Sequence, residues 1–250
     1  MICAASKEGG WGFEEGADIA PGRSVLKALG GGSRYEVLLV WDDRLFAITV
    51  AKVLRPAFVE EERALRELRE EADALASLAH PVLIRGFGAV LGGPFPHVLI
   101  EHLEGPTLRR LLRRGGPLPL EQLLPLAAHV AAALHYMAEE GWVHLDVKPD
   151  NIVMGVPPRL IDLSIARTVS RAAGIRNPIG TDPYMAPEQC APADWHGAIG
   201  PPADVWGLGA TLYHAAVGQR PFPSDPGVRF PQLNQRPVEL PDSVPRLCAS

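Results

Sequence analysis

The chain has 250 residues, of which 47% are hydrophobic and 21% charged, a balance typical of soluble globular proteins. Glycine and proline number 25 each, too few for a collagen-like or a wholly disordered chain. With 24 basic against 29 acidic residues the net charge is −5, which argues against a domain built mainly to bind nucleic acid.

Cysteine usage and the apolar segments indicate the compartment. The three cysteines are widely spaced and form no Cys-x-x-Cys pair, so neither a disulfide framework nor a zinc site is expected, and a cytoplasmic location is predicted. The N-terminus lacks a basic start followed by an apolar run, so no signal peptide is expected. The most apolar stretch, Leu123 to Met137, is too short for a membrane span, and no membrane contact is expected within this segment.

The first part of the chain is predicted to be rich in strands. Residues 1–21 mix glycine, glutamate and small residues, and are expected to form an N-terminal arm. A helix is predicted after Pro56, over the Glu-, Arg-, Ala- and Leu-rich segment Val59–Leu78. Strands are predicted at segments rich in β-forming residues: Ser24–Leu29, Val37–Trp41, Leu45–Leu54, Leu83–Val90 and His97–Leu103.

The second part of the chain is predicted to be helical. Beyond Gly105-Pro106, helices are expected over Thr107–Arg114, Leu120–Glu140 and Ala203–Val217. A β-rich portion followed by a helix-rich one indicates two lobes, with a boundary near Glu104.

The strongest chemical signal is the run HLDVKPDN at residues 144–151, followed by Asp162-Leu163-Ser164 and by GTDPYMAPE at residues 180–188. Turn chemistry explains any one of these polar residues, but hardly five polar identities at fixed offsets. From about Gly22 to Phe222 the sequence resembles the eukaryotic-like Ser/Thr protein kinases of bacteria, whose catalytic loop it matches except at the arginine. The resemblance implies an α+β, bilobal protein-kinase fold, with an N-lobe over 22–103 and a C-lobe over 104–250.

The same resemblance implies roles for the catalytic-loop residues. Phosphoryl transfer needs a hydroxyl aligned with a γ-phosphate whose charge is neutralised. Asp146 is expected to accept the substrate hydroxyl proton, and Lys148 to lie near the transferring phosphate. Asn151 and Asp162 are expected to bind Mg²⁺, a hard cation that prefers carboxylate and amide oxygens. Asp204 matches the family aspartate that steadies this loop, although it would also serve as a helix cap.

A glycine-rich loop at residues 29–37 matches the first two glycines of Gly-x-Gly-x-x-Gly-x-Val, Gly30 and Gly32, and has Tyr35 in place of the third. A strand is predicted after it, not the helix of a dinucleotide-binding fingerprint, and no Gly-Lys-Ser/Thr ends it. The resemblance therefore implies that this loop covers ATP phosphates. Adenine contacts are expected from residues at the matching positions of the lobes and hinge: Val37, Val50, Glu101, Leu103 and Val153.

Lys52 matches the third-strand lysine of the family, which pairs with a glutamate of the following helix. Glu70 and Glu71 are the candidates. Glu71 is three residues after Leu68 and four before Leu75, so it lies within the apolar stripe, where an unpaired carboxylate would be costly. Glu71 is therefore the predicted partner of Lys52, and Mg-ATP is expected to bind between the lobes.

The leading hypothesis is an ATP-dependent kinase of bacterial signalling that phosphorylates Ser or Thr hydroxyls of proteins, since Lys148 and Thr181 are typical of that class. A pseudokinase that binds nucleotide or acts as a scaffold is the alternative, favoured by Leu145 in place of arginine and by Leu163-Ser164 in place of Phe-Gly. A small-molecule phosphotransferase is a third reading, against which the peptide-docking segment GTDPYMAPE argues.

The residue before the catalytic aspartate bears on activation. In family members with an arginine there, it pairs with a phosphate on the activation loop and orders that loop. Leu145 cannot do so. Phosphorylation is therefore not expected to switch the kinase on at any of the hydroxyls of this region: Ser164, Thr168, Ser170 and Thr181.

The last part of the sequence differs from the expected C-lobe. Seven prolines occur among the thirty-two residues after Gly218, and no long helix is predicted there, so the C-lobe is expected to lack its last helices. Glu188 is then expected to lack its usual arginine partner, unless Arg220 or another chain substitutes. Apolar residues of the 203–217 helix are expected to be partly uncovered and to recruit a partner chain: Val205, Leu208 and Leu212.

Overall fold

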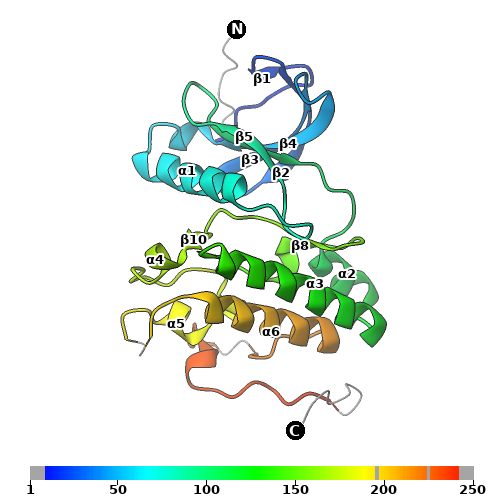
Figure 1. Ribbon diagram of the computed structural model, residues 1–250, viewed down its shortest axis with the longest axis vertical. Helices are drawn as coiled ribbons and strands as arrows, with labels where there is room; N and C mark the ends of the chain where they lie inside the picture. Colours follow the sequence, from blue (N-terminus) through cyan, green and yellow to red (C-terminus); the bar gives the residue numbers. More distant parts are fainter. Residues whose placement is uncertain (1–8, 195–196, 224–225, 242–250) are drawn as a thin grey trace. The chain divides into compact units, whose positions relative to one another are not determined.

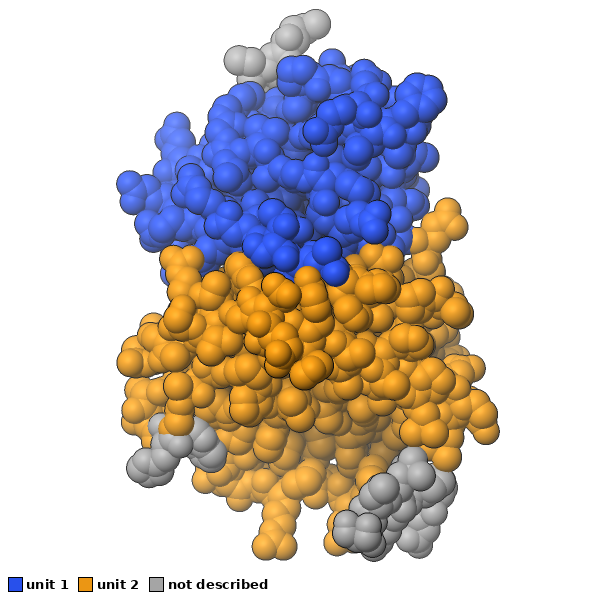
Figure 2. All heavy atoms as spheres, in the orientation of Figure 1, with its two compact units in different colours: residues 1–79, 84–103 blue, residues 80–83, 104–250 orange. Residues whose placement is uncertain are grey.

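The computed structural model describes residues 9–194, 197–223 and 226–241. The chain divides into two compact units (Figure 2), the first comprising residues 1–79 and 84–103, the second residues 80–83 and 104–250. Residues 80–83 lie between a helix and a strand of unit 1 in the sequence, Glu62–Ser77 and Gly86–Val90, but belong to unit 2. There Leu160 N donates a hydrogen bond to Val82 O at 2.6 Å, and Leu83 forms an isolated bridge with Leu160.

Unit 1 consists of a six-stranded sheet with the helix α1 packed on β5 and β6 (Figure 1). The strand order is β1-β2-β3-β4-β6-β5, and each neighbouring pair is antiparallel. The elements are β1 (Asp18–Ala20), β2 (Arg23–Gly31), β3 (Tyr35–Asp42), β4 (Ala47–Leu54), the 3-10 turn η1 (Pro56–Phe58), α1 (Glu62–Ser77), β5 (Gly86–Val90) and β6 (His97–Glu101).

Side-chain alternation along β3 and β4 gives the sheet two faces, one of which packs in the apolar cluster of unit 1. Leu38 and Val40 of β3 and Val53 of β4 are buried in one apolar cluster. Because successive side chains of a strand point to opposite faces, Val37 and its cross-strand partner Lys52 project from the other face. The sheet therefore presents Lys52 on the side opposite to this core.

Residues 9–21, predicted to belong to an N-terminal arm, are instead an integral part of unit 1; residues 1–8 lie outside the described residues. The rings of Trp11 and Phe13 both pack edge to face on the ring of Phe95, with centroid distances of 4.8 Å and 5.0 Å. Trp11 Nε1 also donates a hydrogen bond to Leu54 O at 2.7 Å. These contacts join residues more than forty positions apart, which local composition does not reveal.

Some element boundaries differ from those predicted. The third predicted strand begins at Ala47 instead of Leu45, because the Asp42 carboxylate accepts a hydrogen bond from Leu45 N at 2.8 Å and holds a turn there. The first long helix begins at Glu62 instead of Val59, after the 3-10 turn η1 over Pro56–Phe58. β5 begins at Gly86 instead of Leu83, since residues 80–83 pair within unit 2.

Unit 2 contains the helices α3 and α6, which lie side by side (Figure 1). The helix α6 ends at Val217 and is capped by Gly218, whose φ of 77° is the left-handed conformation favoured by glycine. The elements are α2 (Leu108–Gly115), α3 (Leu120–Glu139), β7 (Trp142–Val143), η2 (Pro149–Asn151), β8 (Ile152–Val153), β9 (Arg159–Leu160), β10 (Arg167–Thr168), α4 (Val169–Ala172), η3 (Asp182–Tyr184), α5 (Pro187–Cys190), α6 (Pro201–Val217) and η4 (Pro231–Leu233).

The expectation of an uncovered apolar surface on α6 is wrong for Leu208. Leu208 is only 8% exposed, because it lies on the broad buried face of α6 with Ala203, Thr211 and Ala215. Leu212 is half-buried, whereas Val205, on the opposite side of the helix, is 67% exposed. That a partner chain covers Val205 stays a prediction.

A further expectation concerns the ion pair of Glu188. Among residues 9–194, 197–223 and 226–241, no cation forms an ion pair with Glu188, and Arg220 lies next to Tyr184 instead. Within the same described part of the chain, no helix combines the length and the apolar character needed to cross a membrane.

A buried histidine links three strands of unit 1. His97 is fully buried; its Nδ1 lies 2.7 Å from Phe95 O and its Nε2 lies 3.1 Å from Arg23 Nη1. Arg23 Nε also donates to Asp42 Oδ2 at 2.7 Å. Burial, aided by the Arg23 charge, lowers the pKa of the His97 ring below its ordinary value. The ring is therefore neutral, donating to Phe95 O and accepting from Arg23.

Lowering the pH should destabilise unit 1, because the folded protein buries His97 in its neutral form. The unfolded chain binds a proton at the ordinary histidine pKa of 6.5, whereas the folded protein binds it only at lower pH. The free energy of unfolding should therefore decrease as the pH falls from about 7.5 to about 5.5, and urea titrations should show a smaller decrease for His97→Gln. An equal decrease in both proteins would contradict the assignment.

Candidate active site

The loop that carries HLDVKPDN is anchored by Asp204, near the start of α6. Asp204 is 3% exposed, and its two carboxylate oxygens accept hydrogen bonds from His144 N and Leu145 N, each at 2.7 Å. Burial raises the pKa of the Asp204 carboxyl, while His144 and the two N–H groups act in the opposite direction. Leu145 has a φ of 66°, a left-handed conformation that persists only when surrounding contacts hold it.

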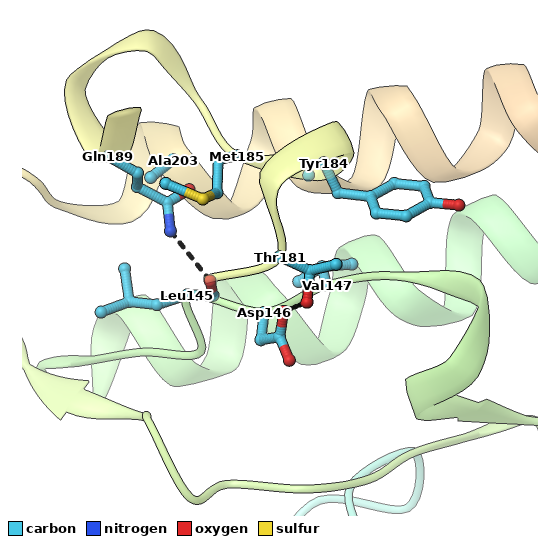
Figure 3. A pocket seen from close by; sticks show the side chains of 9 residues that line it. Leu145, Asp146, Val147, Thr181, Tyr184, Met185, Gln189 and Ala203 are labelled. Atoms are coloured by element: carbon cyan, nitrogen blue, oxygen red, sulfur yellow. Dashed lines mark hydrogen bonds between the residues drawn. The ribbon is translucent and has the colours of Figure 1, made fainter. Parts of the chain in front are cut away.

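Asp146, Lys148 and Thr181 form a closed set of hydrogen bonds. Lys148 Nζ donates to Asp146 Oδ2 at 2.6 Å and to Thr181 Oγ1 at 2.7 Å. Thr181 Oγ1 in turn donates to Asp146 Oδ1 at 2.7 Å, and Figure 3 shows Thr181 lying against Asp146. Each carboxylate oxygen of Asp146 thus has its own partner, which fixes the orientation of the carboxylate.

Asn151 and Asp162 are brought together by the hairpin of β8 and β9. Ile152 pairs with Leu160, and Ile161 N donates to Asn151 O at 2.8 Å, so Asp162 follows directly beside Asn151. Asn151 Nδ2 donates to Asp146 O at 3.0 Å and to Asp146 Oδ2 at 3.1 Å. The amide nitrogen of Asn151 is therefore committed to Asp146, and its amide oxygen is the atom left to act as a ligand.

This donor set suits Mg²⁺. An amide oxygen and a carboxylate are hard oxygen ligands, and Mg²⁺ is usually bound by one or two protein ligands together with phosphate and water oxygens. The described part of the chain contains no group of three or more His, Cys, Asp or Glu side chains that could bind a metal ion by itself. Asn151 and Asp162 therefore fit a magnesium ion that accompanies a phosphate ligand.

In unit 1, Lys52 is paired with Glu71. Lys52 Nζ donates to the two Glu71 carboxylate oxygens at 2.9 and 3.0 Å, and the Glu71 side chain is 3% exposed. The ammonium also lies 4.7 Å from the centre of the Tyr35 ring. Glu71 belongs to the buried face of α1 with Leu68 and Leu75, as its spacing predicts.

The glycine-rich loop joins β2 to β3. Gly30 and Gly31 have φ values of 121° and 144°, and a Cβ on Gly31 would lie 2.3 Å from Tyr35 O, so a side chain is excluded there. Arg55 Nε donates to Gly32 O at 2.9 Å and ties the loop to the end of β4.

The residues predicted to contact nucleotide are divided between the two units. Val37 and Val50 share the Lys52 face of the sheet, and Glu101 ends β6 with its carboxylate accepting from Arg85 N at 2.6 Å. Unit 1 carries Gly30, Gly32, Val37, Val50, Lys52, Glu71, Glu101 and Leu103, and unit 2 carries Asp146, Lys148, Asn151, Val153 and Asp162.

The segment from Asp162 to Thr181 is held by apolar packing around Leu145. Leu145 is 3% exposed and lies in a buried cluster with Val143, Ala186 and Ala203. Half-buried residues of the segment pack against this cluster: Ile165, Val169, Ile175 and Ile179.

The sequence motifs did not point to Gln189, which links the catalytic loop to this segment. Gln189 is 2% exposed, and its Nε2 donates to Leu145 O at 2.8 Å (Figure 3). The same Nε2 donates to Ile179 O at 2.9 Å. A Cβ on Gly180 would lie 2.9 Å from Leu145 O and 3.1 Å from Gln189 Nε2, so the approach also requires a glycine. A lone glutamine beside Glu188 has no spacing signal that would single it out.

A family model described as the protein kinase domain matches residues 23–241. The chain belongs to the protein kinase domain family. This confirms the predicted family and the α+β protein-kinase fold class.

The curated relatives are serine/threonine kinases of bacteria. Serine/threonine-protein kinase PknB of Mycobacterium leprae (strain TN) is 32% identical over 224 residues, which are 86% of this chain and 35% of that protein. PknB of Mycobacterium tuberculosis (strain ATCC 25618 / H37Rv) is 31% identical over 86% of this chain and 36% of its own length. "Serine/threonine-protein kinases drp72" of Corynebacterium efficiens is 30% identical over 90% of this chain and 45% of its own length. The matched region thus spans less than half of each relative.

Replacement of Lys52 tests the role of its ammonium group in unit 1. Lys52→Met should leave a folded protein but lower phosphoryl transfer by about a hundredfold or more, because it removes a positioned cation and deprives buried Glu71 of its lysine. Lys27→Met, which changes an exposed lysine of β2, is the matched control. Transfer rates and circular dichroism of both variants check this, and a wild-type rate for Lys52→Met would contradict it.

Proposed function

We propose that this chain is an active kinase domain that transfers the γ-phosphate of Mg-ATP to serine or threonine hydroxyls of protein substrates. The observation that carries the proposal is the set of hydrogen bonds among Asp146, Lys148 and Thr181. A general base must be held in one orientation to accept a proton from a bound hydroxyl, and these bonds provide that orientation.

Each residue of the site has a step in this mechanism. Asp146 accepts the proton of the substrate hydroxyl and aligns its oxygen with the γ-phosphate. Lys148, held beside Asp146, adds positive charge near the transferring group, and Thr181 shapes the place where the hydroxyl sits. Asn151 and Asp162 would bind Mg²⁺, which neutralises phosphate charge when it is bound.

Unit 1 supplies nucleotide contacts in this proposal. Lys52, oriented by Glu71, binds phosphate oxygens. Gly30 and Gly32 let the backbone of their loop approach the phosphates closely. The remaining residues contact the adenine through apolar side chains or backbone groups: Val37, Val50, Glu101, Leu103 and, from unit 2, Val153. A cytoplasmic location is part of the proposal, because ATP is available there and Cys190 is a free buried thiol.

A pseudokinase is the second candidate. Tyr35 stands where related kinases have a glycine, and its ring lies 4.7 Å from Lys52 Nζ, the atom proposed to bind phosphate. A protein in which this ring obstructs the phosphates would bind nucleotide or a partner without transferring phosphate. A small-molecule phosphotransferase is less favoured, because the peptide-docking segment contributes Thr181 directly to the Asp146 cluster.

Substitution of Asp146 separates these functions. Asp146→Asn should lower transfer of radiolabel from [γ-³²P]ATP to a generic protein substrate by about a hundredfold or more, because the amide cannot accept the hydroxyl proton. Asp150→Asn, in the same loop and with a 46% exposed side chain, is the matched control. Phosphoamino-acid analysis should find phosphoserine or phosphothreonine. If the wild type binds nucleotide but transfers no phosphate, the chain is a pseudokinase. If it transfers phosphate to a small molecule such as an aminoglycoside and not to protein, the chain is a small-molecule phosphotransferase.

Activity should not depend on phosphorylation of the activation segment. Leu145 offers no cation for a phosphate, and the segment already packs on the cluster that contains Leu145. A phosphate on Thr181 would also place negative charge next to Asp146. Phosphatase-treated protein, verified by mass spectrometry, should keep the transfer rate of untreated protein. Loss of activity on treatment, with recovery after autophosphorylation, would contradict this prediction.

A further inference from the structure

The position of Thr181 depends on the turn that follows it. The 3-10 turn η3 covers Asp182–Tyr184, and Tyr184 N donates to Thr181 O at 2.9 Å. Thr181 Oγ1 contacts Asp146 and Lys148, but these bonds do not restrain the far end of the turn at Met185. The hydroxyl of Tyr184 lies 2.7 Å from His214 Nδ1 and ties η3 to α6, and a further contact bonds the backbone at the two ends of the turn.

Gln232 makes that contact from a segment fifty residues away in the sequence. Gln232 lies in η4, is 5% exposed, and donates from Nε2 to Asp182 O at 2.7 Å and to Met185 O at 3.1 Å. These carbonyls flank η3, so one amide group spans the whole turn. Cys190 Sγ lies 3.1 Å from the same nitrogen.

The surroundings of Gln232 fix which end of its amide faces the turn. Three acceptors surround the nitrogen, whereas Oε1 is buried and has no hydrogen-bond partner among the described residues. Burying an amide oxygen without a hydrogen bond is unfavourable. The hydrogen bonds made by the amide nitrogen must therefore stabilise this orientation by more than the unpaired oxygen destabilises it. Exchanging the two ends of the amide would set an oxygen against two carbonyl oxygens.

Arg229 adds a second, weaker attachment of the same segment. Its Nε and Nη2 lie 2.9 and 3.3 Å from the two carboxylate oxygens of Asp182. The side chain of Arg229 is 66% exposed and that of Asp182 37%, so solvent screens this pair and its contribution is small. The buried amide of Gln232 is therefore the principal link.

We propose that Gln232 is a positioning residue for phosphoryl transfer: by bonding both ends of η3 it holds Thr181 against Asp146 and Lys148. This rests on the proposed kinase function. Gln232 itself is not expected to touch substrate or nucleotide. Its loss should impair the use of protein substrate, which depends on Thr181, and leave ATP binding unchanged.

Gln232→Met tests this, because methionine has a similar length but cannot donate the two hydrogen bonds. We expect kcat/KM for a protein or peptide substrate to fall about tenfold, with an unchanged dissociation constant for ATP. Gln235→Met, at an exposed glutamine of the same segment, is the matched control and should behave as wild type. Gln232→Asn, which keeps the amide and removes one methylene group, is the milder variant if Gln232→Met does not fold.

Two measurements decide the structural part without relying on activity. In Gln232→Met, amide hydrogen exchange over residues 182–186 should become faster, and iodoacetamide should alkylate Cys190 faster, as mapped by peptide mass spectrometry. Exchange and alkylation equal to those of Gln235→Met would overturn the proposal, as would faster exchange with unchanged kcat/KM. If the wild-type chain transfers no phosphate, the proposed function fails, while exchange and alkylation still show whether Gln232 braces the turn.

Discussion

One buried carboxylate, that of Asp204, sets the geometry of the loop from His144 to Asn151, on which the candidate-site residues of that loop depend. A carboxylate is costly to bury unless hydrogen bonds replace its water, and two adjacent backbone N–H groups of the catalytic loop do so here. Satisfying both at once holds Leu145 in its left-handed conformation. The Leu145 side chain then enters the apolar cluster, its carbonyl meets Gln189, and Asp146 meets Thr181.

Neutral groups hold the segment from Asp162 to Thr181 and the turn that follows it. Gln189 bonds it to the catalytic loop, Gln232 bonds the turn after Thr181, and residues such as Ile179 pack on the cluster around Leu145. Amides do not titrate and cost less to bury than charges, so the hydrogen bonds of these two glutamines do not depend on a protonation state. Leu145, which precedes Asp146, is itself a member of this apolar cluster.

In unit 1 the candidate-site lysine is held by a buried ion pair with Glu71, not by neutral groups. Breaking such a pair by removing one partner is strongly destabilising, whereas the intact pair contributes little net stability. The pair of Lys52 and Glu71 is therefore better explained by position than by stability. The sheet sets Lys52 on the face away from the apolar cluster of Leu38 and Val53, and α1 brings Glu71 to it.

Local patterns in the sequence were sufficient to predict the family, the partner of Lys52 and the motif residues that meet in unit 2. Helical spacing distinguished Glu71 from Glu70, and motif spacing identified Asp146, Lys148 and Asn151, which the structure brings into contact. The pairing of Glu71 with Lys52 could be predicted because helical periodicity is a property of neighbouring residues, and the roles of Asp146, Lys148 and Asn151 stay predictions.

Only the tertiary structure decided which distant residues meet. Trp11 and Phe13 pack on Phe95, so a segment that looked like a loose arm is part of the core of unit 1. Gln189 and Gln232 find carbonyl partners 10 to 50 residues away. A single amide carries no periodicity, and its partners are chosen by the folded backbone, so neither glutamine could be recognised from the sequence.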